Sequence, residues 1–160
     1  MGHSFGSLTA FRLVQALPTD TFKSQILLNP IFKFSDDLKI TRLRRISYLL
    51  KYLTFRGTQT VKELDDFFPE DLKKLRDETL ETQGQHGLTV ESFINIYRMQ
   101  QLVEEQKCID KIKIPTLMIT GKQDCYEDSL KTTSIFNIIK GAKHRKLFEV
   151  TPQSAYLNKA

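Results

Sequence analysis

The chain begins Met1-Gly2-His3-Ser4-Phe5-Gly6, and the residues that follow have the spacing of a helix. In 7–17 the apolar residues Leu8, Phe11 and Val14 recur at helical intervals, and a proline directly after this segment ends the pattern. A Gly-x-Ser-x-Gly pentapeptide immediately before a helix predicts a tight turn with a strained backbone, which points the serine hydroxyl outward.

The residues of this turn are candidates for one chemical site. Ser4 is the candidate nucleophile, and the backbone N–H of Phe5 is placed to donate to an oxyanion that develops beside it. Gly2 and Gly6 are expected to let the strand and the helix pass closely, because neither carries a Cβ atom. The N-terminus of the helix would add positive potential at the same place.

A second segment places an acid at the end of a strand. The run 114–120, Ile-Pro-Thr-Leu-Met-Ile-Thr, has strand character, and Gly121 ends it. Asp124 follows directly, at the edge where open α/β sheets form their sites, so it is the candidate acid that orients a histidine. Glu127 and Asp128 are close alternatives for the same role.

Strand-like and helical segments alternate along the chain. Three short apolar runs predict buried strands, at 24–29, 114–120 and 146–150. Strands separated by helices favour a parallel α/β sheet. Between the first two strands, amphipathic helices replace the strand-like runs. We therefore predict a core formed by residues 1–30 and 111–160, with a helical cap inserted at 31–110.

Helix ends are marked by capping residues. Thr89 is the expected N-cap of one helix, and Gly141 is the expected stop after another. The remaining predicted helices lie at 38–53, 60–68, 69–81 and 128–140.

The helix at 38–53 combines a leucine-rich stripe with arginine and lysine residues on the other face. Such a helix can bind a membrane surface, and the net charge of +5 would suit anionic lipid. In a cap, such a stripe more often covers the active-site cleft or packs on neighbouring helices, and we favour this interpretation. The chain contains no nucleic-acid-binding motif and no C-x-x-C pair, and we expect no metal or other cofactor.

Together these segments resemble the α/β-hydrolase superfamily, in particular its cap-bearing esterases and lipases. Residues 1–30 and 110–153 match that family in order and character, whereas the cap matches only in being helical. The resemblance implies a partial α/β-hydrolase fold, with Ser4 as nucleophile, Asp124 as acid and a small apolar acyl compound as substrate or ligand.

Two departures from the family bear on activity. The family's early strands are expected to be missing, together with the loop that provides the second oxyanion donor. In addition, Gln153 stands 29 residues after Asp124, where the family has its catalytic histidine, and a glutamine cannot shuttle a proton near neutral pH. We interpret His3 as structural, and His86 and His144 as surface residues.

Two functions remain open at this point. The first is a serine hydrolase that is incomplete or inactive as this chain, and the second is a non-catalytic binding protein that uses the cap cleft. No apolar run is long enough to span a membrane and no signal peptide begins the chain, so a cytoplasmic location is expected. Substrate and oligomeric state cannot be read from the sequence.

Overall fold

The computed structural model describes residues 1–35, 41–55, 89–122 and 127–151. The chain divides into two compact units, one formed by residues 1–35 and 99–160 and the other by residues 36–98. The helices predicted at 60–68 and 69–81 lie outside the described residues.

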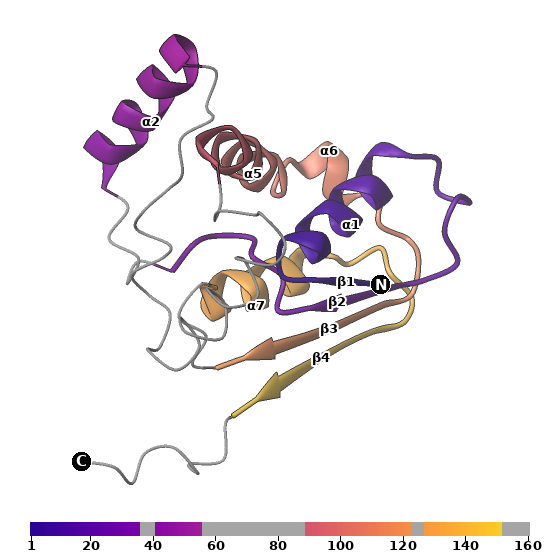
Figure 1. The fold of residues 1–160 in the computed structure, drawn as a ribbon. Helices are drawn as coiled ribbons and strands as arrows, with labels where there is room; N and C mark the ends of the chain where they lie inside the picture. The colour runs from indigo at the N-terminus through magenta and orange to yellow at the C-terminus, as the bar shows by residue number, and fades with distance from the viewer. Residues whose placement is uncertain (36–40, 56–88, 123–126, 152–160) are drawn as a thin grey trace, which may run out of the picture. The chain divides into compact units, whose positions relative to one another are not determined.

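The first unit contains a parallel sheet, as the sequence predicts (Figure 1). Its strands lie in the order β1 (Gly2–His3), β2 (Gln25–Leu28), β3 (Thr116–Gly121) and β4 (Arg145–Val150). The prediction of only three strands is wrong. Two residues are too few to show a pattern, yet Gly2 and His3 pair with Leu27 and Leu28 of β2.

Helices cover one face of this sheet. Figure 1 shows α1 (Phe5–Ala16), α6 (Gln106–Ile109) and α7 (Ser129–Ile138) on the same side of the strands. Side chains alternate along β3, so Met118 is fully buried beneath the helices while its neighbours in the strand are half-buried. Phe11 of α1 packs edge-to-face on Phe32, with ring centroids 4.8 Å apart. This helical layer and the strands beneath it form the core.

The end of α7 differs from the prediction. The helix stops at Ile138, before the predicted end at Lys140, and Ile139 is its C-cap. Gly141 therefore does not terminate the helix. A Cβ atom there would lie 2.8 Å from the carbonyl oxygen of Ile112, so a close approach of two backbone segments requires this glycine.

In the second unit, α2 (Arg42–Phe55) is described together with the first part of α5 (Val90–Leu102). The predicted cap at Thr89 is present, because its hydroxyl oxygen accepts a hydrogen bond from the N–H of Ser92 at 3.1 Å. Tyr48 of α2 is buried and packs on Phe93 of α5, with ring centroids 5.3 Å apart. The guanidinium of Arg45 lies 5.1 Å from the Tyr97 ring centroid.

The leucine stripe of α2 is exposed in the described part of the chain. Its side chains are between 42% and 79% exposed, and they are Leu43, Ile46, Leu49, Leu50 and Leu53. Aromatic and arginine side chains form the contacts between α2 and α5, so α2 packs on α5 through a face other than the stripe. None of the helices in the described part of the chain is both long enough and apolar enough to cross a bilayer.

Candidate active site

Ser4 sits in a strained turn between β1 and α1. Its φ of 55° and ψ of −124° lie outside the regions that L-residues ordinarily adopt. Its N–H donates to the carbonyl of Leu28 at 2.9 Å, which holds the turn against β2. The side chain makes no capping hydrogen bond to α1. Such strain costs about 1–3 kcal/mol and persists only where the surrounding structure enforces it.

The two glycines of the turn have different surroundings. A Cβ atom on Gly2 would lie 2.4 Å from the carbonyl oxygen of Gly6 and 2.7 Å from the Cα of Ser7, so only glycine fits there. A Cβ atom on Gly6 would meet nothing within 4 Å, and the expected close approach at Gly6 is therefore absent. Gly2 alone lets β1 and α1 pass each other.

The first turn of α1 faces the carboxyl edge of the sheet. Phe5 is the first residue of the helix, so no helical carbonyl precedes it to accept its N–H. Its ring packs edge-on against Phe34, with centroids 6.0 Å apart. The backbone N–H of Phe5 is thus held close to Ser4, at the positive end of the helix.

The buried hydroxyl of Ser7 holds this turn against β2, and the sequence analysis did not predict this contact. The Oγ atom of Ser7 donates to the carbonyl of Leu28 at 2.9 Å and accepts from the N–H of Leu28 at 2.9 Å. Asn29 was missed as well; its φ of 42° makes it a second strained residue, directly after β2. Asparagine tolerates positive φ, and this tolerance is the only sequence signal that could have indicated the position.

The candidate acids follow β3, whose carboxyl end lies at the same edge as Ser4. The register pairs His3 with Leu28 and Leu28 with Ile119, so the chain leaves β3 at Gly121 close to the strand that carries the turn. Asp124 itself lies outside the described residues.

The two alternative acids are engaged by neighbouring groups. Glu127 is 3% exposed, and its Oε1 accepts from the hydroxyls of Thr120, at 2.8 Å, and of Thr132. Asp128 is the N-cap of α7, and its carboxylate pairs with the Nζ of Lys33 at 2.8 Å. These contacts give Asp128 a structural role at the start of α7.

Asp128 should therefore contribute to stability in a pH-dependent way. Partial burial alone would raise the pKa of Asp128, but the hydrogen bonds from Lys33 and from the N–H of Lys131, together with the charge of Lys33, lower this pKa below its usual value. The contribution is present above the unfolded pKa, near 4, and is lost as pH falls through the folded pKa.

We expect Asp128→Ala to lower the free energy of unfolding by about 1 kcal/mol at pH 7, since the helix cap and the ion pair are both lost. Asp128→Asn should cost less, because asparagine is also a good N-cap. Urea denaturation at neutral pH and near pH 3 would check the sign of the pH effect. The loss of unfolding free energy caused by Asp128→Asn should be smaller near pH 3 than at neutral pH. An equal loss at both pH values would refute a stabilising role for the ionised carboxylate of Asp128.

None of the described histidines lies where a base for Ser4 is needed. His3 is exposed on β1, and its side chain points away from the face that α1 covers, since Gly2 points toward the helix. His144 is exposed and precedes β4, at the amino edge of the sheet, so it lies at the opposite edge from Ser4. His86 and Gln153 lie outside the described residues. In the part of the chain that the structure covers, no three His, Cys, Asp or Glu side chains are grouped as metal ligands.

Comparisons with known proteins match this arrangement over nearly the whole chain. The family model for serine aminopeptidase, S33, matches residues 1–152. A monoacylglycerol lipase from Paleococcus ferrophilus shares 18% identity at a TM-score of 0.71, with 94% of this chain and 57% of that chain covered. No curated protein matches the sequence at a significant level.

Two further solved structures share the fold. One is a soluble variant of monoglyceride lipase from Saccharomyces cerevisiae, in complex with a substrate analogue. It has 12% identity and a TM-score of 0.63, with 94% of this chain and 52% of that chain covered. The other is an α/β-hydrolase enzyme from a Medee basin deep-sea metagenome. It has 18% identity and a TM-score of 0.50, with coverages of 94% and 55%. This chain thus spans little more than half the length of each matched structure.

Proposed function

Because the chain belongs to the serine aminopeptidase, S33, family of α/β hydrolases, we propose that it is a serine hydrolase for an ester or related acyl compound. The observation that carries the proposal is the conformation of Ser4. A φ of 55° in a non-glycine residue, at the junction of a strand and a helix, is the geometry that presents a nucleophilic hydroxyl above a sheet.

The proposed chemistry assigns a role to each group of the turn. The Oγ of Ser4 attacks the acyl carbonyl while its proton passes to solvent water, and the tetrahedral oxyanion accepts a hydrogen bond from the N–H of Phe5. Collapse of this intermediate breaks the bond to the leaving group, which departs as an alcohol or phenolate, and leaves the acyl group on Ser4. Asp124 is the proposed acid at the end of β3. Since Gln153 cannot accept the serine proton, we expect slow turnover from this chain, with acylation restricted to substrates that have good leaving groups.

A small apolar acyl compound is the proposed substrate. Two of the matched structures are described as monoacylglycerol or monoglyceride lipases, and one of them holds a substrate analogue. This chain covers just over half of each, so the substrate class is part of the proposal and not a property of the fold.

Hydrolysis of p-nitrophenyl butyrate tests the proposal, because p-nitrophenolate leaves without needing a proton. We expect a burst of about one equivalent of p-nitrophenolate followed by slow turnover, as an acyl group accumulates on Ser4. Ser4→Ala should abolish the burst. A burst of the same size from Ser4→Ala would exclude Ser4 as the nucleophile.

A non-catalytic α/β-hydrolase-like binding protein is the second candidate, and Gln153 is the observation that favours it. This candidate predicts no burst from the wild type, together with saturable binding of a long-chain monoacylglycerol. The same binding by Ser4→Ala would then show that the hydroxyl is not needed for that function.

Membrane-surface binding is an additional property that the exposed stripe of α2 supports. Leu43 and Leu53 are 79% and 68% exposed, and the exposed Arg42 lies at the start of the same helix. Vesicles of phosphatidylcholine and phosphatidylserine should sediment with the protein, and high salt should weaken this binding by screening the basic side chains.

The double variant Leu43→Ser/Leu53→Ser should lose most of this vesicle binding. Leu13→Ser, which replaces a leucine on α1 that is 45% exposed, is the matched control and should behave as wild type. Equal vesicle binding by the double variant and the control would exclude the α2 stripe.

A further inference from the structure

The hydroxyl of Ser7 joins the first turn of α1 to the backbone of β2. Ser7 is completely buried, and its Oγ atom donates to the carbonyl of Leu28 and accepts from the N–H of the same residue, each at 2.9 Å. A hydroxyl has one proton to donate, and here the carbonyl of Leu28 receives it. Ser7 is therefore placed as a partner of β2 and not as a second nucleophile.

The same carbonyl of Leu28 also holds Ser4. The N–H of Ser4 donates to it at 2.9 Å, and the carbonyl of Ser4 accepts from the N–H of Ser7 at 3.0 Å. Ser4, Ser7 and Leu28 thus form a closed ring of hydrogen bonds. The ring encloses the backbone of Phe5, whose N–H is the proposed oxyanion donor. Such a ring can enforce a strained conformation like that of Ser4, whose φ is 55°.

Leu28 connects this ring to β3 as well. The next residue, Asn29, has a φ of 42°, and its N–H donates to the carbonyl of Ile119 at 2.7 Å. Ile119 belongs to β3, the strand after which the proposed acid Asp124 follows in the sequence. A shift of Leu28 would therefore disturb both the turn of the nucleophile and the strand that precedes the acid.

We infer that Ser7 is a positioning residue for acylation, because its buried hydroxyl keeps Ser4 Oγ and Phe5 N–H in the arrangement that acts on one acyl carbonyl. Position 7 lies outside the Gly-x-Ser-x-Gly pattern, and its role in the chemistry rests on the proposed hydrolysis. Misplacement of a reacting group by about 1 Å can slow a reaction about 100-fold. Loss of this hydroxyl should therefore slow acylation although the nucleophile is still present.

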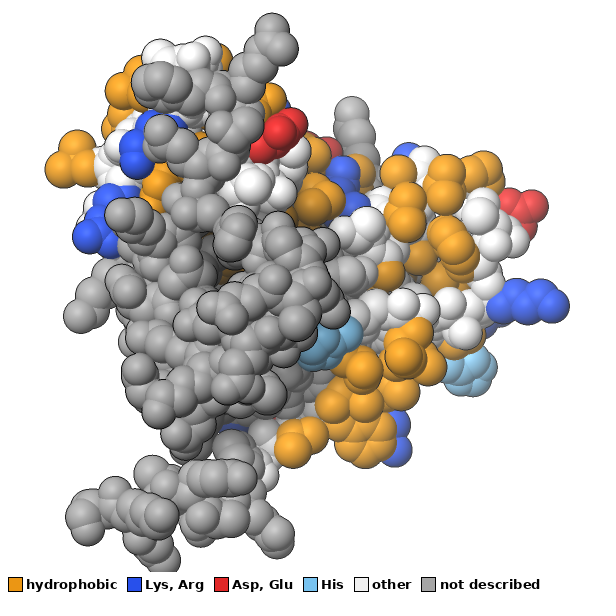
Figure 2. Space-filling model, viewed as in Figure 1, with side chains coloured by type: hydrophobic (Ala, Val, Ile, Leu, Met, Phe, Trp, Pro, Cys, Tyr) orange, Lys and Arg blue, Asp and Glu red, His pale blue; other side chains and the backbone are white. Residues whose placement is uncertain are grey.

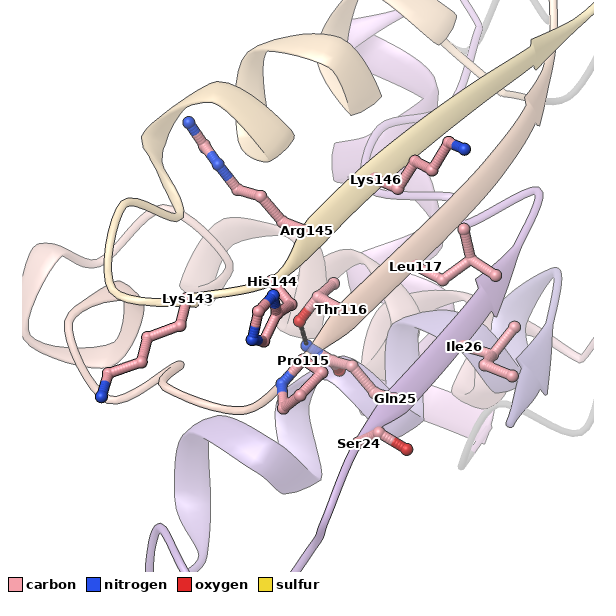
Figure 3. Close-up of a pocket in the computed structure, with 10 residues that line it drawn as sticks. All are labelled: Ser24, Gln25, Ile26, Pro115, Thr116, Leu117, Lys143, His144, Arg145 and Lys146. Atoms are coloured by element: carbon pink, nitrogen blue, oxygen red, sulfur yellow. Dashed lines mark hydrogen bonds between the residues drawn. The ribbon is translucent and has the colours of Figure 1, made fainter.

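A second buried hydroxyl in the same sheet provides a matched control. The Oγ1 of Thr116 accepts from the Nε2 of Gln25 at 2.9 Å and donates to the carbonyl of Ile114 at 3.1 Å. Figure 3 shows Thr116 and Gln25 at a hollow beside the amino ends of β2, β3 and β4, whereas Ser4 follows the carboxyl end of β1. Thr116→Val thus removes a buried hydroxyl with the same kinds of hydrogen bond, but at the opposite edge of the sheet.

Pre-steady-state hydrolysis of p-nitrophenyl butyrate separates binding of the ester from acylation. The burst rate at increasing ester concentration gives a dissociation constant and a rate constant for acylation. The separation is needed because exposed hydrophobic side chains, orange in Figure 2, can also take up an apolar ester. Ser7→Ala should lower the acylation rate constant about 10- to 100-fold and change the dissociation constant less than about two-fold. Thr116→Val should change neither constant by more than about two-fold.

Amide hydrogen exchange tests the same link without an ester. In Ser7→Ala, the N–H of Ser4 should exchange with solvent at least about ten-fold faster than in wild type, because the ring of hydrogen bonds is opened. Thr116→Val should leave this exchange rate unchanged. The thiol of Ser7→Cys is a weaker donor and acceptor, so this variant should give intermediate exchange and acylation rates. It provides the test if Ser7→Ala does not fold.

Three results would overturn the inference. They are an acylation rate constant in Ser7→Ala within about two-fold of wild type, equal losses of acylation in Ser7→Ala and Thr116→Val, or unchanged exchange of the Ser4 N–H in Ser7→Ala. A wild-type chain without a burst would refute the proposed hydrolysis, and with it the role of Ser7 in acylation. Faster exchange in Ser7→Ala would then show that the failure lies in the chemistry and not in the hold of Ser7 on the turn.

Discussion

Gln153→His should raise the steady-state rate of p-nitrophenyl butyrate hydrolysis by about 10²- to 10⁴-fold, the usual contribution of a positioned general acid–base group. Gln153 stands 29 residues after Asp124, where the family has its catalytic base. An imidazole can take the proton of Ser4 during acylation and can activate water during deacylation, whereas the glutamine amide can do neither. Stopped-flow and steady-state kinetics would separate the burst from turnover.

Two control variants test whether the gain in rate depends on the new imidazole and on Ser4. Gln153→Asn should behave as wild type, because it changes the side chain without adding a base. Ser4→Ala/Gln153→His should show no gain, because the histidine then has no nucleophile to serve. If Gln153→His leaves turnover unchanged while circular dichroism shows a native fold, the triad arrangement that we propose at this edge of the sheet is wrong.

Gly2→Ala should be the most damaging single change in the turn. The added methyl group would lie 2.4 Å from the Gly6 carbonyl oxygen and 2.6 Å from its carbon, so the backbone of β1 or α1 must move. Overpacking of this kind costs about 3 kcal/mol, a large share of the stability of a domain. The movement would also displace Ser4, and the burst of p-nitrophenolate should disappear with it.

Gly6→Ala is the matched control for this clash. Gly6 lies inside α1, and an added Cβ atom meets nothing within 4 Å. Alanine is the better helix former by about 0.5–1 kcal/mol, so this variant should be as stable as wild type or slightly more stable. Urea denaturation measures the free energy of unfolding of both variants and so tests both expectations. Greater loss of stability in Gly6→Ala than in Gly2→Ala would show that the turn is packed differently.

The elements that the sequence predicted correctly have strong local patterns. The run of apolar residues in β3 and the spacing of Leu8, Phe11 and Val14 in α1 are local signals, and both elements formed within a few residues of the predicted bounds. The cap at Thr89 likewise depends on a contact with a residue three positions later. Local chemistry was sufficient in each case.

The features that were missed depend on contacts between distant parts of the chain. The strand β1 has only two residues and is defined by its pairing with β2. The hydroxyl of Ser7 is buried because it bonds to Leu28, 21 residues away. On α2, ring and guanidinium contacts to α5 bury Tyr48, on a face that the leucine pattern did not indicate. No local pattern encodes such choices.

The claim that most of this account depends on is that Ser4 is a reactive nucleophile. Incubation of the 160-residue chain with a fluorophosphonate probe, followed by tryptic digestion and mass spectrometry, tests it most directly. We predict one covalent adduct, located on Ser4 and absent from Ser4→Ala. A folded wild-type chain that stays unlabelled, or an adduct that forms on another residue, would contradict the account.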